Sequence, residues 1–139
     1  MTPDKSMLLK GVSMVKKIRI KVGLIEAIAE LNDTRTAQAI WEALPIKGHV
    51  NLWGDEIYFS IPLSLGLEMG QESVNVGDLA YWPDGSAFCI FFGPTPITQR
   101  DKIRPTSPIT VFGKVTGDTT VFKKVTSGAE IIVERRSNG

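Results

Sequence analysis

The chain has 139 residues, of which 42% are hydrophobic and 22% are charged. This length favours one domain, which can bury enough surface to fold without a disulfide or a structural metal ion. The 16 basic and 15 acidic residues nearly balance, which excludes an acidic tail protein and a highly basic nucleic-acid coat.

We expect no targeting signal in the first residues. The apolar stretch of residues 7–9 is too short for the core of a signal peptide, and no small-residue cleavage site follows it. We expect a flexible N-terminal extension over residues 1–13 and a single domain over residues 14–136. No apolar run approaches the ~18 residues of a membrane helix, and a lone cysteine is typical of a reducing compartment, so we expect a cytoplasmic protein.

The first periodic segments predict a β-hairpin. Within residues 15–22, apolar and basic side chains alternate, which is typical of a half-buried strand with a charged outer face. Gly23 separates this strand from a second apolar-rich run over residues 25–31, and the turn-forming residues 32–33 follow. These two runs are expected to pair with each other.

The next segment predicts a helix of about three turns. Four apolar residues share one face at spacings of three and four: Ala37, Ile40, Trp41 and Leu44. Asn32 or Asp33 can cap the start of the helix, and Pro45 ends it. We expect this helix to close one mouth of a barrel, with Trp41 well buried.

Short extended runs separated by turn signals fill most of the remaining chain. Strands are expected over residues 49–53, 56–61, 78–82, 87–92, 109–115 and 131–135. Residues 83–85 form a strong turn signal, and irregular loops are expected over 62–77 and 93–108. Residues 119–125 favour a second short helix. The sum predicts a mainly β fold: a closed, mostly antiparallel eight-stranded β-barrel with two short capping helices.

Three stretches, in this order, resemble cyclophilins. Residues 31–44 resemble the first-helix segment, and residues 85–96 resemble the Gly-Ser-Gln-Phe-Phe-Ile strand with its exit loop. Residues 109–125 resemble the Val-Phe-Gly-Lys-Val strand that leads into the last helix. The resemblance covers residues 15–135 and implies a cyclophilin-like barrel.

The chain also resembles a smaller prokaryotic family of cyclophilin-like proteins whose biochemical function is not established. The similar segments are WGDEIYF at 53–59, YWPDG at 81–85 and FFGPTP at 91–96. Aromatic residues cluster in these segments. We expect most of them to pack in the core and the remainder to offer an apolar recognition surface.

The cyclophilin resemblance implies an isomerase of X-Pro peptide bonds, which holds the proline ring in an apolar pocket and directs an arginine at the substrate. No arginine lies in the matching segment at residues 50–53. Ser60 and Ala87 stand where that family has glutamines, and Cys89 stands where it has a pocket phenylalanine. Arg104 falls near the position of the pocket tryptophan. A fold can persist while its site is lost or replaced.

The sequence therefore predicts a non-catalytic module that binds a peptide or a small molecule in a degenerate cyclophilin groove. The groove candidates are Trp53, Tyr58, Ser60, Ala87 and Cys89. The alternative is a weak or atypical peptidyl-prolyl cis-trans isomerase. In that case, Arg100 or Arg104 would swing from the 93–108 loop to replace the missing arginine.

Cys89 and His49 could form a nucleophile pair, since a thiol beside an imidazole is a recurring catalytic arrangement. Alternation through residues 87–92 places Cys89 on the face opposite Phe88 and Ile90. We expect a small buried thiol there and an ordinary surface or edge histidine at position 49.

The remaining charged residues are expected to be solvated. Asp55 and Glu56 are adjacent and point to opposite faces of a strand, so we interpret them as a solvated turn. Lys17, Arg19 and Lys21 could bind phosphates, but the low net charge favours a solvated strand face, and we expect no nucleic-acid partner.

Cofactor and metal sites are not expected either. The sequence has no Gly-x-Gly-x-x-Gly after a strand and no Walker lysine loop, so no nucleotide cofactor is predicted. One cysteine and one histidine cannot complete a four-ligand zinc site unless carboxylates supply the rest. The single cysteine also excludes a disulfide within the chain, and the oligomeric state stays open.

Overall fold

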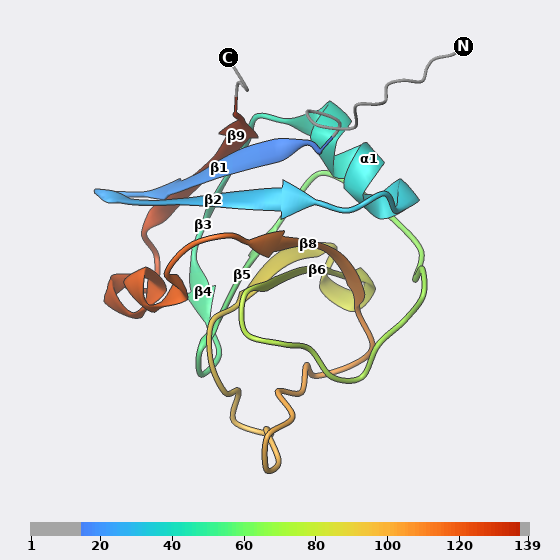
Figure 1. The fold of residues 1–139 in the computed structure, drawn as a ribbon, viewed down its shortest axis with the longest axis vertical. Coiled ribbons are helices and arrows are strands. Elements are labelled where there is room, and N and C mark those ends of the chain that lie inside the picture. Colours follow the sequence, from blue (N-terminus) through green and yellow to red (C-terminus); the bar gives the residue numbers. More distant parts are fainter. Residues whose placement is uncertain (1–14, 137–139) are drawn as a thin grey trace.

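The barrel is built from one antiparallel sheet. The computed structural model describes residues 15–136, and the extension expected over residues 1–13 lies outside them. Nine strands pair in the order β3-β9-β1-β2-β8-β6-β7-β5-β4, and every pair is antiparallel. The sheet curls into a nearly closed barrel with α1 at one end (Figure 1). The mainly β barrel expected from the sequence is confirmed.

Nine strands and three short helices follow one another along the described residues. The strands are β1 (Lys17–Val22), β2 (Ile25–Leu31), β3 (Ile46–His49), β4 (Asn51–Leu52), β5 (Glu56–Ser60), β6 (Asp78–Trp82), β7 (Ala87–Phe91), β8 (Thr110–Val115) and β9 (Glu130–Arg135). The helices are α1 (Arg35–Ala43) and two 3-10 helices, η1 (Pro83–Gly85) and η2 (Thr119–Lys124). No helix within residues 15–136 is long and apolar enough to cross a membrane.

The sheet has nine strands rather than eight because the chain changes partner at Val50. The sequence predicts one strand over residues 49–53, but β3 pairs with β9 and β4 pairs with β5. Between them, the Val50 N–H donates to the Ala129 carbonyl, and the Val50 carbonyl accepts from the Gly128 N–H. One extended run is thus divided between β3 and β4, which stand at the two ends of the strand order.

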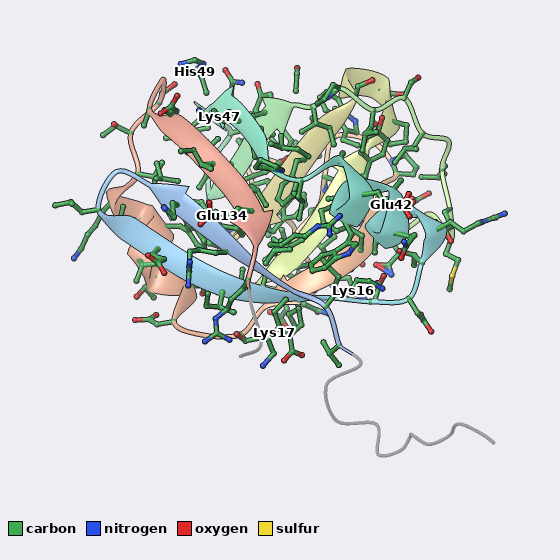
Figure 2. The ribbon with its side chains drawn as sticks, turned by 90° about the horizontal axis from the view of Figure 1, so that it is seen from above. Lys16, Lys17, Glu42, Lys47, His49 and Glu134 are labelled. Carbon is green, nitrogen blue, oxygen red and sulfur yellow. The ribbon has the colours of Figure 1, made fainter. Side chains whose placement is uncertain are left out.

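The basic residues of β1 lie on its outer face, as predicted, and acidic neighbours pair with them. The Arg19 Nε lies 2.8 Å from a Glu26 carboxylate oxygen on β2, and an Arg19 terminal nitrogen lies 3.6 Å from Glu134 on β9. Lys21 also lies 3.6 Å from Glu134, which is labelled in Figure 2. The alternate residues of β1 are buried in the barrel: Ile18, Ile20 and Val22.

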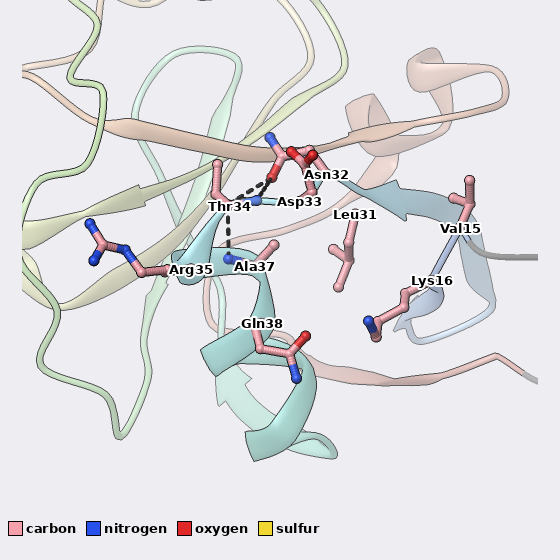
Figure 3. A pocket seen from close by; sticks show the side chains of 9 residues that line it. All are labelled: Val15, Lys16, Leu31, Asn32, Asp33, Thr34, Arg35, Ala37 and Gln38. Atoms are coloured by element: carbon pink, nitrogen blue, oxygen red, sulfur yellow. Dashed lines mark hydrogen bonds between the residues drawn. The ribbon is translucent and has the colours of Figure 1, made fainter. Parts of the chain in front are cut away.

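Helix α1 is capped by Thr34 rather than by Asn32 or Asp33. The Thr34 hydroxyl accepts a hydrogen bond of 3.0 Å from the Ala37 N–H, which lacks a partner inside the helix. Asn32 acts one step earlier, because its side-chain oxygen accepts from both the N–H and the hydroxyl of Thr34 (Figure 3). Asn32, one of the two residues expected to cap the helix, thus orients Thr34, which does cap it.

Trp41 is half-buried, so the expectation that it is well buried is wrong. The Arg135 guanidinium lies 4.6 Å from the centre of the Trp41 ring, and the Lys16 ammonium lies 5.9 Å from it. Arg135 also donates two hydrogen bonds, of 3.2 and 3.0 Å, to the Trp41 carbonyl. The side chain that α1 buries fully against the barrel is Ile40.

Truncating Ile40 is therefore expected to destabilise the fold more than truncating Trp41. Ile40→Ala should lower the free energy of unfolding by about 2–5 kcal/mol, because it leaves a cavity in a closed core. Trp41→Ala should lower it by about 1–3 kcal/mol, from partial burial and a cation–π contact. Urea denaturation of both variants measures the two losses of unfolding free energy. A larger loss for Trp41→Ala than for Ile40→Ala would contradict the half-buried position of Trp41.

Glu68 fastens the 62–77 loop to the start of α1. Its carboxylate accepts hydrogen bonds from the Arg35 N–H (3.0 Å), the Thr36 N–H (2.9 Å) and the Thr36 hydroxyl (2.7 Å). The Glu68 N–H donates to the Thr110 hydroxyl on β8. The hydroxyl and N–H bonds from Thr36, and then the N–H of Arg35, hold the pKa of Glu68 below its ordinary value of 4.5.

Glu68→Gln is expected to lower the melting temperature at pH 7, because the amide loses the charge that favours a helix N-terminus. A carboxyl with a depressed folded-state pKa stabilises the fold above its unfolded pKa, and that stabilisation is lost as the pH falls below about 4.5. The difference from wild type should therefore shrink in thermal melts at pH 3. Glu72→Gln, in the same loop but exposed, is the control and should leave both melts unchanged.

Candidate functional site

Strand β7 separates two apolar clusters, because both of its faces are buried. Phe88 and Ile90 belong to the main core inside the barrel. Cys89 and Phe91 belong to a second cluster on the outer face. The predicted alternation, with Cys89 as a small buried thiol, is confirmed. Residues from β6, from the 62–77 loop and from residues 103–109 complete the second cluster: Val74, Ala80, Ile103 and Ile109.

A pocket of about 150 Å³ opens beside this outer cluster. Its lining residues are Trp53, Glu56, Tyr58, Trp82 and Thr106. The Tyr58 and Trp82 rings meet edge to face, with centroids 6.2 Å apart and an interplanar angle of 83°, an arrangement that aromatic pairs favour. The pocket is therefore small and largely aromatic, with one carboxyl group in its wall.

Two of the three segments that resemble the prokaryotic family meet at one side of this pocket. Trp53 and Glu56 close a tight turn, in which the Glu56 N–H donates to the Trp53 carbonyl (3.2 Å). The Asp55 N–H then donates to the Pro94 carbonyl, and the Phe92 N–H donates to the Asp55 carbonyl, each at 2.9 Å. The turn that presents Trp53 and Glu56 is thus fixed against residues 91–96.

Two glycines make this contact feasible. Gly54 has a φ of +60°, which glycine adopts without strain. A Cβ on Gly54 would also lie 2.8 Å from a side-chain atom of Pro96 and 2.9 Å from the Pro94 carbonyl oxygen. A Cβ on Gly93 would overlap the Asp55 carboxylate. The close approach of the two segments accounts for glycine at both positions.

The third segment, residues 81–85, supplies Trp82 to the wall of the pocket. The Trp82 indole N–H donates to the Ser107 hydroxyl at 2.6 Å, and that hydroxyl donates to the Asp84 carboxylate at 2.9 Å. A Cβ on Gly85 would contact the Trp82 ring, so the η1 turn lies directly against the indole. These contacts fix the ring in one orientation.

The 93–108 loop brings the last lining residue, Thr106, to the pocket. The Thr95 hydroxyl donates to the Arg104 carbonyl at 2.6 Å and lies 3.1 Å from the Thr98 hydroxyl. Ile103 is buried in the outer cluster. Apolar burial and internal hydrogen bonds therefore hold this loop against the outer cluster and place Thr106 in the pocket wall.

Glu56 is buried, so its interpretation as part of a solvated turn is wrong. Only 6% of the residue is exposed, because it begins β5 opposite Phe91 and faces the outer cluster. Burial raises the pKa of Glu56 from 4.5 to about 7, although a hydrogen bond with the Cys89 thiol opposes the shift. Asp55 is the solvated member of the pair and lies 3.2 Å from the Lys123 ammonium.

Cys89 is not a candidate nucleophile in this arrangement. Burial, followed by the nearby charge of Glu56, raises the pKa of its thiol well above the ordinary value, and it is the thiolate that reacts. His49 is exposed at the end of β3 opposite Glu130, as expected of an ordinary surface or edge histidine. The group that contacts the Cys89 thiol is the Glu56 carboxyl.

The predicted groove residues share one face of the sheet but take different roles. Trp53 and Tyr58 line the pocket. Cys89 and Ala87 are buried beside it in the outer cluster, where Cys89 pairs with Tyr58 across the strands. Ser60 pairs with Ala87 but is exposed.

Sequence reasoning missed three lining residues: Glu56, Trp82 and Thr106. Glu56 precedes Tyr58 by two positions in a strand, so alternation alone places both side chains on one face. Trp82 lies in a segment that the sequence had singled out. Thr106 comes from an irregular loop, and no periodic signal marks it.

Arg100 and Arg104, the weak catalytic candidates, line a different pocket within the 93–108 loop, of about 370 Å³. Neither lines the aromatic pocket. A wider hollow of about 590 Å³ lies at the start of α1 (Figure 3). Its wall includes Val15, the first described residue, and it holds no tryptophan, tyrosine or phenylalanine. The aromatic pocket is therefore the candidate site.

The fold and this outer-face pocket define a cyclophilin-like barrel protein. The chain matches the Cyclophilin-like family over residues 16–134 and belongs to that family. It is similar to the hypothetical protein AF2241 from Archaeoglobus fulgidus, with 39% identity, a TM-score of 0.74, and coverage of 88% of this chain and 95% of that one. No curated protein matches the chain.

A second solved structure, McbB in complex with tryptophan, is similar in fold. The identity is 16% and the TM-score is 0.68, with 88% of this chain and 45% of that one covered. At this identity, the similarity shows the shared fold alone.

Glu56→Gln is expected to stabilise the protein at pH 8, because the buried carboxylate is replaced by a neutral group of the same shape. A carboxyl whose pKa is about 7 when folded and 4.5 when unfolded costs stability progressively as the pH rises between those values. The gain should be about 1–3 kcal/mol at pH 8 and should shrink towards pH 5. Urea denaturation at both pH values measures it, with exposed Glu130→Gln as the control. A variant less stable than wild type at pH 8 would contradict the assigned environment.

Proposed function

We propose that this protein is a non-catalytic binding module that holds a small ligand, or one side chain of a peptide, in the aromatic pocket. The observation that carries this proposal is that residues 53–59 and 81–85 supply four of the five lining residues, while residues 91–96 hold the turn of the first segment in place by hydrogen bonds. Their glycines, turns and hydrogen bonds present Trp53 and Trp82 in fixed positions.

The dimensions and lining of the pocket support a binding role. Rigid aromatic side chains provide a large contact area at a low cost in conformational entropy, and ligand sites are often lined in this way. A volume of about 150 Å³ admits a group of a few heavy atoms and excludes a dinucleotide or a folded peptide. The rest of a longer ligand would lie on the outer face beside exposed Ser60.

The charge in the pocket argues against proline isomerisation. The cyclophilin resemblance implies a guanidinium directed at the twisting amide, and removing one preorganised donor from an active site commonly costs ~10²–10³ in rate. Here the charged lining residue is Glu56, whose sign is opposite. Arg100 and Arg104 lie in the separate loop pocket.

The purified protein is therefore expected to leave X-Pro isomerisation of a tetrapeptide at its uncatalysed rate, tens to hundreds of seconds at 25 °C. A protease-coupled assay with wild type, Arg100→Ala and Arg104→Ala measures this. Acceleration by wild type that either substitution abolishes would establish the isomerase alternative. Acceleration that survives both substitutions, and that repurification removes, would come from a host isomerase and leave the binding proposal intact.

Binding itself can be followed through the three tryptophans. Trp53 and Trp82 line the pocket, whereas Trp41 lies on α1 beside Arg135. In nitrogen-15 NMR spectra, a panel of N-acetyl amino-acid methylamides should contain members that shift the indole signals of Trp53 and Trp82 but not that of Trp41. If no member of the panel does so, the binding proposal fails.

A further inference from the structure

We infer that the aromatic pocket binds an alkylammonium group, such as the head of a lysine side chain or of a methylated amine. This inference rests on the proposed binding function and adds the chemical class of the ligand. It follows from the walls of the pocket, from the charge beside it and from its size.

The walls suit a cation. The pocket is lined by Trp53, Tyr58 and Trp82, and the negative face of an aromatic ring attracts an ammonium group within about 6 Å. Tryptophan is the most effective of these side chains, and two of the three are tryptophans. Several aromatic rings around one small volume are the usual protein site for methylated ammonium groups.

A carboxyl group in the wall adds a counter-charge that is not already neutralised. Within residues 15–136, no lysine or arginine forms an ion pair with Glu56. Its hydrogen-bonding neighbour is the Cys89 thiol, which carries no positive charge. Burying a carboxylate without a partner costs free energy, and a ligand cation bound beside Glu56 would offset that cost.

The charged side chains around the pocket also favour a cationic ligand. Asp84 lies behind Trp82, linked to the indole through Ser107, and adds a second negative charge. The nearby Lys123 ammonium is already paired with Asp55 at 3.2 Å. The surroundings therefore favour a cation and disfavour a carboxylate or phosphate ligand.

The size limits the ligand to the end of a chain. About 150 Å³ corresponds to roughly five water molecules at ~30 Å³ each. An ammonium or trimethylammonium group with part of its alkyl stem fits this space. The polar lining residue Thr106 is exposed, so this part of the wall borders solvent.

The ionisation of Glu56 predicts how binding depends on pH. Because its pKa is about 7, part of the population is protonated at neutral pH and must release a proton when a cation binds. The titratable groups around it are the Cys89 thiol on β7, which hydrogen-bonds with it, Tyr58 in the same pocket wall, and Asp84, which is linked to Trp82 through Ser107. Affinity for an ammonium ligand should therefore rise as the pH increases from 6 to 8.

The test compares matched probes on the full chain. N-acetyl-lysine methylamide and its trimethylated form are titrated against N-acetyl-norleucine methylamide, which has the alkyl stem without the ammonium group. The indole signals of Trp53 and Trp82 report binding, and Trp41 is the internal reference. We expect both ammonium probes to bind at least tenfold more tightly than the norleucine probe, and more tightly at pH 8 than at pH 6.

Two variants test the assigned contacts. Glu56→Gln should weaken the lysine probe by about tenfold and remove the pH dependence, whereas exposed Glu130→Gln should change neither. Trp53→Leu, read through the indole signal of Trp82, should weaken binding of the ammonium probes but not of the norleucine probe.

Equal binding of charged and neutral probes, unaffected by Glu56→Gln, would overturn the ammonium inference and leave the proposed binding function standing. If no probe and no other member of the amino-acid panel shifts Trp53 or Trp82, both proposals fail.

Discussion

β7 is buried on both of its faces, and the arrangement of the barrel and its loops follows from that burial. Phe88 fills the barrel interior while Cys89 faces outward, and apolar surface left in water on either side would cost about 25 cal/mol per Å². The barrel covers one face. The other is covered by the 93–108 loop, which Ile103 anchors in the outer cluster. The position of Thr106 in the pocket is a consequence of that cover.

The same cover leaves the small aromatic pocket beside the outer cluster. Glu56 occupies the wall, and Arg100 and Arg104 lie within their own loop. The chain matches the Cyclophilin-like family over residues 16–134, which include every strand of the barrel apart from the last residue of β9. Packing constrains the strands to few solutions, but a surface site can change its chemistry without altering the fold.

Much of the fold can be predicted from the sequence, because local periodicity reports which side of an element is buried. Alternation in residues 17–22 correctly separates the core residues from the basic outer face. The helical stripe correctly identifies α1, although Thr34 rather than Asn32 caps it. Alternation also assigns Cys89 to the outer face, where it pairs with Tyr58 across the strands. Each of these conclusions depends on neighbours a few residues apart.

Tertiary structure alone decided the features that depend on residues far apart in the chain. Glu56 follows a turn and resembles a solvated residue, but it is buried because Phe91 and the outer cluster lie against it. Trp41 has the spacing of a core residue yet stays half-buried at the edge of the core, where Arg135 from the last strand lies over its ring. Thr106 reaches the pocket only through the packing of its loop. The sequence by itself therefore determined which face of each regular element is apolar, whereas long-range packing decided what covers that face and where the cover leaves an opening.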